Sequence, residues 1–162
     1  MINAVLDIKL LASEDWQLLK ATRLRALCNS PAAFVSDYAL EVHKTDEQWR
    51  ELLTAATWVV AMEAGVVIGI AALFPGHLGS EQHIESIWVA PTHRQSGVFS
   101  TLLNALVDRE RKRGTRDLAL WVLENNHDAK AAYTRLGFVP TGERQPLSRD
   151  RFEMRLRLKI DD

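Results

Sequence analysis

The spacing of apolar and polar residues changes along the chain, and each change predicts a different element. In the first third, apolar residues recur at helical spacing over about residues 14–28 and 45–56, after a short apolar stretch at 8–11. The second helix begins with Thr45-Asp46-Glu47-Gln48, a capping-box pattern. Residues 58–74 are two β-branched apolar runs separated by Glu63-Ala64-Gly65, which is typical of a β-hairpin.

The rest of the chain alternates strands with helices. Each strand is predicted by a run of apolar residues or by strict alternation of apolar and polar residues. Each helix is predicted by apolar residues that recur about every 3.6 residues and stop at a glycine. Proline cannot continue a strand ladder, so the first of these strands stops before Pro91. The expected order is a strand at 83–89, a helix at 97–113, a strand at 118–123, a helix at 128–136 and a strand at 152–158, with a loop at 143–150.

Composition restricts the class of protein. The 162 residues, 47% apolar and 25% charged, predict a single globular domain over 1–162. Twenty basic against 21 acidic residues give a net charge of -1, so neither a nucleic-acid nor a membrane partner is expected. Cys28 cannot form an internal disulfide and is expected to be a small buried group, and no signal peptide or membrane span is visible. We expect a cytoplasmic protein.

The segment between the strand at 83–89 and the next helix suggests an anion site. Unpaired backbone N–H groups at a helix start, together with the helix dipole, bind phosphate. Here Arg94-Gln95-Ser96-Gly97 leads into the helix. The chain contains neither G-x-G-x-x-G nor G-x-x-x-x-G-K-[ST], so the phosphate would belong to neither a dinucleotide nor a nucleoside triphosphate held by those loops. The same helix ends in the basic run 109–113, expected to be solvated.

Three motifs in order resemble those of the GCN5-related N-acetyltransferase (GNAT) family. IWVAPTHRQSG resembles the family strand and its R-x-x-G-x-G/A acyl-CoA loop, and Asn126, Ala129, Tyr133 and 136–138 resemble N-x-x-A-x-x-x-Y-x-x-x-G-F. Arg23, Arg25, Pro31 and Trp49 resemble the N-terminal helical region of bacterial members. The resemblance implies an α/β fold with a mixed, centrally splayed sheet flanked by helices on both faces. It also implies transfer of an acetyl group from acetyl-CoA to a primary amine.

The resemblance also implies site residues. Tyr133 would be the acid that protonates the leaving thiolate, although a tyrosine packed in the core fits the same pattern. Family members share no position for the base, so the candidate comes from the strand itself. Glu85 would act as base or substrate ligand, since strand parity puts it on the face of Val89; His83 is an alternative base, and a salt-bridged or exposed Glu85 is the other possibility. The coenzyme would contact Ile87, Trp88, Val89, Arg94, Gln95, Ser96, Gly97, Val98, Phe99, Ser100 and Asn126.

The loop departs from the family pattern at Gln95 and Phe99, where small residues are usual. We expect the Phe99 ring to pack in the core, leaving its N–H available. The departure motivates an alternative, a non-catalytic acyl-CoA-binding sensor or scaffold, and a protein-interaction domain without a ligand is a third possibility. Four histidines, His43, His77, His93 and His127, lack metal-ligand spacing, so no metal is expected. The acceptor would be a small-molecule or peptide amine, selected by the first two helices and the loops at 75–80 and 143–150, and the family's frequent dimers suggest a homodimer.

Overall fold

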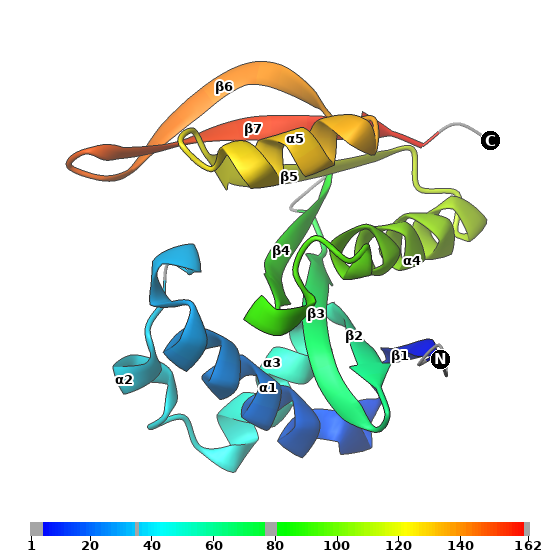
Figure 1. Cartoon of the computed structure of the whole chain (residues 1–162), viewed down its shortest axis with the longest axis vertical. Helices are drawn as coiled ribbons and strands as arrows, with labels where there is room; N and C mark the ends of the chain where they lie inside the picture. The colour runs from blue at the N-terminus through cyan, green and yellow to red at the C-terminus, as the bar shows by residue number, and fades with distance from the viewer. Residues whose placement is uncertain (1–4, 35, 77–80, 161–162) are drawn as a thin grey trace.

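One mixed sheet organises the molecule, and its strands follow the order β1-β2-β3-β4-β5-β7-β6 (Figure 1). The computed structural model describes residues 5–34, 36–76 and 81–160. The strands are β1 (Leu6–Leu10), β2 (Thr57–Glu63), β3 (Val66–Phe74), β4 (Gln82–Val89), β5 (Asp117–Leu123), β6 (Val139–Ser148) and β7 (Arg151–Lys159). The α-helices are α1 (Trp16–Asn29), α2 (Tyr38–Glu41), α3 (Asp46–Ala55), α4 (Val98–Lys112) and α5 (His127–Arg135), with 3-10 turns η1 (Ser13–Asp15), η2 (Pro31–Ala33) and η3 (Pro91–His93).

Local signals place several of these elements where the sequence predicts them. The capping box of α3 is formed, with Gln48 N donating to Thr45 Oγ1 at 3.2 Å and Thr45 N donating to Gln48 Oε1 at 2.9 Å. The β2–β3 hairpin turns at Ala64-Gly65, both in the left-handed region. The predicted hairpin and the helix 97–113 are therefore confirmed.

Helices cover both faces of the sheet, as the resemblance implies. α4 packs on β3 so closely that a Cβ on Gly69 would lie 2.9 Å from Leu102 Cδ1, which explains a glycine in mid-strand. α1 and α3 lie on the opposite face, where Trp58 Nε1 donates to the carbonyl of Leu52 at 3.1 Å. α5 is on the α4 side, since Tyr133 contacts Phe99 of α4.

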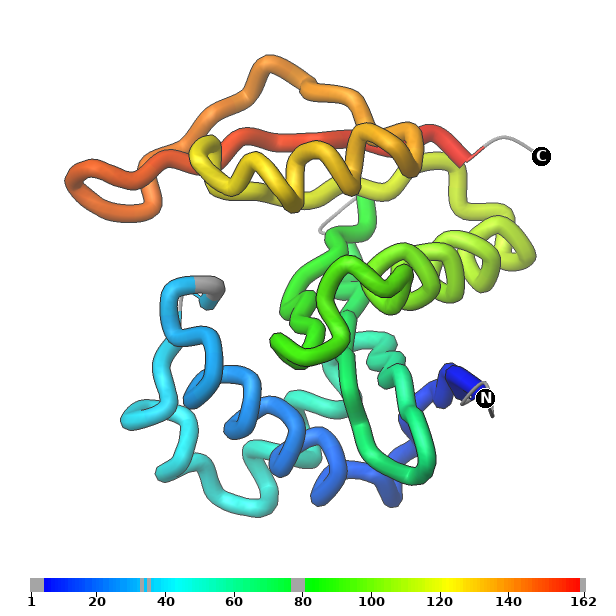
Figure 2. The backbone as a smooth tube through the Cα atoms, viewed as in Figure 1, coloured from blue at the N-terminus to red at the C-terminus, as the bar shows by residue number. Residues whose placement is uncertain are grey.

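The sheet divides at its centre. β4 and β5 are parallel, but they pair only at Gln82 with Leu118 and at His83 with Ala119. Beyond these pairs the two strands diverge, and Figure 2 shows β4 and β5 running in different directions. The predicted central splay is therefore confirmed, and β4 has one hydrogen-bonding edge turned toward the diverging β5.

The structure corrects three expectations about elements. Residues 139–148 form the edge strand β6, although 143–150 was expected to be a loop; Pro140 and Pro146 hid the strand pattern, and an edge tolerates proline because one side needs no ladder bonds. Cys28 is exposed rather than packed. Within the basic run 109–113, Glu110 is 1% exposed and accepts hydrogen bonds from Gln82 and Thr115, so the run is not wholly solvated.

Candidate active site

The edge of β4 that faces β5 carries a free backbone donor. Ala90 N donates to the carbonyl of Ile68 at 2.8 Å, and Trp88 is paired with Ile70. Because neighbouring residues of an antiparallel strand point their peptide groups to alternate sides, the Val89 N–H points away from β3 and toward β5. Among the described residues, nothing accepts this hydrogen bond. The edge of β4 thus offers the Val89 N–H as a backbone donor on the side of β5.

A β-bulge separates Val89 from Glu85. Glu85 pairs with Ala72 and Val89 with Gly69, so three steps along β3 face four steps along β4, and Ser86 adopts a φ of 58°. Paired residues share a face, and residues 69 and 72 point to opposite faces. The expectation that Glu85 shares the face of Val89 is therefore wrong: the extra residue reverses the parity, which places Glu85 on the α1–α3 side and Val89 on the α4 side.

The side-chain contacts of Trp88 agree with this register. Its indole Nε1 donates to Ser30 Oγ at 3.2 Å, and the Arg25 guanidinium lies 5.1 Å from its ring centroid, both on α1 or directly after it. The Trp88 side chain is thus buried in the core, and only its backbone is left for a ligand. Ile87, beside the bulge, is half-buried.

The loop before α4 presents the expected donors. Gln95 and Gly97 have φ values of 58° and 87°, and α4 begins at Val98. The first intrahelical bond runs from Thr101 N to the carbonyl of Gly97 at 3.0 Å, so the N–H groups of Val98, Phe99 and Ser100 have no partner within the helix. A Cβ on Gly97 would meet nothing within 4 Å. The loop is thus an open helix N-terminus that suits a phosphate.

Three polar side chains expected to bind the coenzyme are engaged within the protein. Arg94 Nε donates to the carbonyl of Val89 at 3.1 Å and its Nη2 donates to Ser30 Oγ at 2.8 Å. Ser96 Oγ donates to the carbonyl of His93. Asn126 Oδ1 caps α5 by accepting from Ala129 N at 3.2 Å. These side chains shape the loop and the start of α5, and Arg94 occupies the Val89 carbonyl while leaving its N–H free.

Tyr133 lies in an aromatic cluster between α4 and α5. Its ring centroid is 5.2 Å from that of Phe99 and 5.6 Å from that of Phe138, and the residue is 6% exposed. The Phe99 ring packs against the core, as expected. Burial raises the pKa of Tyr133 above its ordinary value. The phenol therefore stays protonated at neutral pH, which is the form a proton donor needs.

Glu85 lies at the surface of the opposite face, yet the protein around its carboxylate changes the pKa of that group. Desolvation raises the pKa of Glu85, the charge of Arg23 lowers it, and the charge of Glu153 raises it; the net direction is upward. A carboxylate with a raised pKa is a stronger base. His83 lies two residues away on the same face, with a partner of its own.

Sequence reasoning had no signal for two of the charged groups near Glu85. Glu153 on β7 and Glu41 on α2 come from distant parts of the chain. Arg23 was noticed only as part of the N-terminal resemblance. Only the tertiary structure assembles Arg23, Glu41 and Glu153 around the start of the bulge.

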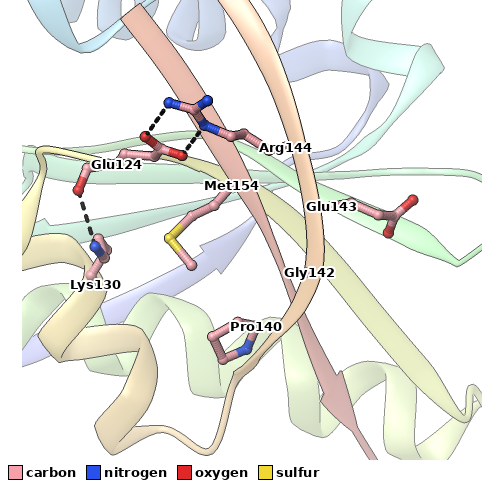
Figure 3. A pocket seen from close by; sticks show the side chains of 7 residues that line it. All are labelled: Glu124, Lys130, Pro140, Gly142, Glu143, Arg144 and Met154. Atoms are coloured by element: carbon pink, nitrogen blue, oxygen red, sulfur yellow. Dashed lines mark hydrogen bonds and ion pairs between the residues drawn. The ribbon is translucent and has the colours of Figure 1, made fainter.

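A pocket of about 440 Å³ lies elsewhere, under the arch that β6 makes over β7 (Figure 3). Between Pro140 and Arg144 the register with β7 shifts, so β6 rises off its neighbour. Figure 3 shows Arg144 paired with the Glu124 carboxylate and Lys130 bonded to the Glu124 carbonyl. No expected catalytic or coenzyme-contacting residue lines this pocket, whereas Glu143 and Arg144 belong to the segment 143–150 that was expected to select the acceptor.

Comparison with known proteins decides the family. The profile of the acetyltransferase (GNAT) family matches residues 21–138, which is more than half of the chain and includes both β4 and the α4 loop. The chain belongs to the GNAT family.

Two solved structures of acetyltransferases cover almost the whole chain. An N-acetyltransferase from Staphylococcus aureus Mu50 has a TM-score of 0.77 at 18% identity, covering 98% of this chain and 100% of that one. The yncA protein from Salmonella typhimurium, described with its cofactor acetyl-CoA, has a TM-score of 0.75 at 20% identity, covering 97% and 95%. At these identities the likeness shows the GNAT fold.

Curated GNAT relatives are similar over shorter stretches. Streptothricin acetyltransferase from Streptomyces lavendulae is 36% identical over 86 residues, which are 53% of this chain and 46% of that protein. An uncharacterized N-acetyltransferase from Methanocaldococcus jannaschii is 40% identical over 55 residues, 34% of this chain and 24% of that protein. The chain thus matches about half or less of the length of these curated relatives.

The described residues include neither a cluster of metal ligands nor a membrane-spanning helix. No group of three or more His, Cys, Asp or Glu side chains in residues 5–34, 36–76 and 81–160 could hold a metal ion. Within the same ranges, no helix is long and apolar enough to cross a membrane. His77 and residues 77–80 of the expected acceptor loop lie outside the described residues.

Proposed function

We propose that this GNAT protein transfers an acetyl group from acetyl-CoA to a primary amine by direct attack, without a covalent enzyme intermediate. One observation carries the proposal: the free N–H of Val89 faces the diverging β5, directly upstream of the open N-terminus of α4. A fixed donor at the strand edge and a phosphate site at a helix start suit the two ends of an acyl-CoA.

The chain's residues fit acetyl-CoA on the α4 side of the sheet. The N–H groups of Val98, Phe99 and Ser100 would bind the pyrophosphate, and the open space at Gly97 allows close approach. The Val89 N–H would donate to the thioester carbonyl and stabilise the negative charge that develops there. The support from outside the chain is that a fold neighbour, yncA, is described with acetyl-CoA.

The proton transfers divide between the two faces. As the amine nitrogen bonds to the acetyl carbon and the carbon–sulfur bond breaks, Tyr133 on the α4 side would give its proton to the leaving thiolate. Glu85 on the α1–α3 side would take the proton that the amine must lose. For an amine with a pKa near 10.4, losing the ammonium proton at neutral pH costs about 5 kcal/mol. In this proposal the acid and the base act from opposite sides of the sheet, because Tyr133 lies on the α4 side and Glu85 on the α1–α3 side.

The acceptor would be a small-molecule or peptide amine. The name of one relative, streptothricin acetyltransferase, supports including a streptothricin in the test panel. The panel should also hold polyamines, amino acids and peptides with a free N-terminus, because those differ in charge and size around the same nucleophile.

The deciding experiment measures CoA thiol release from acetyl-CoA with each amine of the panel. We expect amine-dependent release, and mass spectrometry should show an acceptor heavier by one acetyl group. Tight acetyl-CoA binding with no release for any amine would instead favour the sensor or scaffold alternative that Phe99 motivates. Absence of acetyl-CoA binding in calorimetry would contradict both.

A further inference from the structure

Arg23 on α1 uses its whole guanidinium on partners within the protein. Nε and Nη2 donate to the two carboxylate oxygens of Glu41 at 3.0 and 2.9 Å, and Nη1 donates to Ser86 Oγ at 2.9 Å. The guanidinium carbon also lies 4.9 Å from the ring centroid of Phe34. Each of the three guanidinium nitrogens therefore has a partner within the protein, and these contacts join α1 to α2 and to β4.

The pair is buried and charged. The side chains of Arg23 and Glu41 are 11% and 5% exposed. Burial works against the charged form of Glu41, but Arg23 outweighs it and keeps the pKa of Glu41 below its ordinary value. A bidentate arginine–carboxylate pair has a fixed geometry, so the third contact, to Ser86, is directed as well.

Ser86 lies in the β4 bulge. It is the described residue of β4 with a positive φ, 58°, a conformation that persists in a non-glycine residue only when the surroundings hold it. Its side chain is bonded to Arg23 from another element. The residue before it is Glu85, and Val89 follows three residues later.

We propose that Arg23, held by Glu41, is a positioning residue that locks the β4 bulge through Ser86. The lock fixes the face on which Glu85 stands and the direction of the Val89 N–H. Without the extra residue at this point, strand parity would put Glu85 and Val89 on one face, because a one-residue change of register reverses every side chain beyond it. The inference rests on the proposed function of this site.

Two substitutions separate the lock from general stability. Ser86→Ala removes one hydroxyl, and Arg23→Lys keeps the charge but loses the fork that binds Glu41 and Ser86 together. The matched controls are Ser13→Ala, in η1, and Arg50→Lys, on α3 over Trp16, both away from β4. We expect kcat to fall roughly tenfold to a hundredfold in the first two variants, because small displacements of reacting groups lower the rate by such factors. In the two control variants kcat should stay at the wild-type value.

A measurement without turnover tests the lock itself. Amide hydrogen exchange by NMR should be at least about tenfold faster over residues 84–89 in Ser86→Ala than in the wild type, because the bulge opens more often, and unchanged in Ser13→Ala. Should Arg23→Lys fail to fold, Ser86→Ala still decides the matter, since it deletes a single partly buried atom.

A pH profile distinguishes positioning from charge. The charged and titratable groups around Glu85 are Arg23 from α1, Glu41 from α2 paired with it, Glu153 from β7, and His83 on the same strand. Arg23→Gln should move the acidic limb of kcat/KM to higher pH, because the cation that lowers the Glu85 pKa is gone. Arg23→Lys should leave the limb in place and lower only kcat.

The outcomes are distinct. Wild-type kcat and wild-type exchange in both Ser86→Ala and Arg23→Lys would overturn the positioning role and leave the proposed function intact. If the wild-type protein releases no CoA with any amine, the proposed function fails and the catalytic part of this inference fails with it. Faster exchange together with lower kcat supports it.

Discussion

Tyr133 and Tyr38 are the two tyrosines of the chain, and their surroundings differ. Tyr133 is 6% exposed between the rings of Phe99 and Phe138, whereas Tyr38 on α2 is 41% exposed. We predict that Tyr133→Phe lowers kcat about a hundredfold or more, because it removes the proton donor. The ring contacts remain, so acetyl-CoA affinity and the melting temperature should change little. CoA release measures kcat and calorimetry measures acetyl-CoA affinity, with Tyr38→Phe as the control. Wild-type turnover in Tyr133→Phe would show that the phenol is not the proton donor.

Ionisation of Glu85 affects the stability of the protein as well as its proposed activity. Folding raises its pKa, so the folded state binds this proton more tightly than the unfolded chain does. The contribution of Glu85 to the free energy of unfolding is therefore fully present below the unfolded pKa and is lost as pH rises through the folded pKa. Glu85→Gln, which stays neutral, should melt above the wild type at pH 7 and lose that advantage toward pH 4.

The same variant should lose activity. We expect Glu85→Gln to lower kcat about a hundredfold and to abolish the acidic limb of the rate profile, since the group that must be ionised is gone. Glu51→Gln, on the exposed side of α3, controls for removal of a carboxylate. A variant with normal turnover and a normal acidic limb would show that another group, such as His83, takes the amine proton.

At the scale of elements, the start of α4 is the feature to test. Gly97 and Gly65 both have positive φ, 87° and 78°, and a Cβ at either would meet nothing within 4 Å. Alanine at each position should therefore cost a similar 1–2 kcal/mol or so of backbone strain in thermal unfolding. Calorimetry should show acetyl-CoA binding weakened about tenfold or more in Gly97→Ala only. Equal affinities in the two variants would place the phosphate elsewhere.

The start of α5 separates a cap from a ligand contact. Asn126 Oδ1 caps the helix, so Asn126→Ala should cost about 1 kcal/mol of stability, while Asn126→Asp keeps the cap. Thr45→Ala removes the cap of α3, which is remote from the site, and controls for lost stability. If the Asn126 amide also donates to the coenzyme, Asn126→Asp should bind acetyl-CoA more weakly than the wild type at unchanged melting temperature.

On the scale of the whole molecule, β4 and β5 join the two halves of the sheet through only two residue pairs. A ligand that binds between the diverging strands contacts both halves in the folded state alone. At a concentration about 100 times its Kd it should add about 2.7 kcal/mol to the free energy of unfolding. For a domain of this size that is a rise of roughly 5–10 °C in melting temperature with acetyl-CoA. An unchanged melting temperature at millimolar acetyl-CoA would contradict binding.

The sequence alone determined most of the architecture, because most helices and strands follow from the residue pattern within their own segments. Apolar period, the capping box at Thr45 and the turn at Gly65 predicted the elements of β2, β3, α3 and α4, and motif order predicted the splayed sheet. Free amides at the start of α4 were also predictable, since every helix leaves its first N–H groups unpaired. The edge strand β6 was not, because its prolines remove the alternation on which strand prediction depends.

Only the tertiary structure decided which way Glu85 faces. Parity along a strand is a local rule, and one extra residue at Ser86 reverses it without any mark in the sequence. The contact that accompanies the bulge comes from Arg23, 63 positions earlier, with Glu41 behind it. Contacts over such separations depend on how the helices pack on the sheet, so the local pattern could not predict that Glu85 and Tyr133 lie on opposite faces.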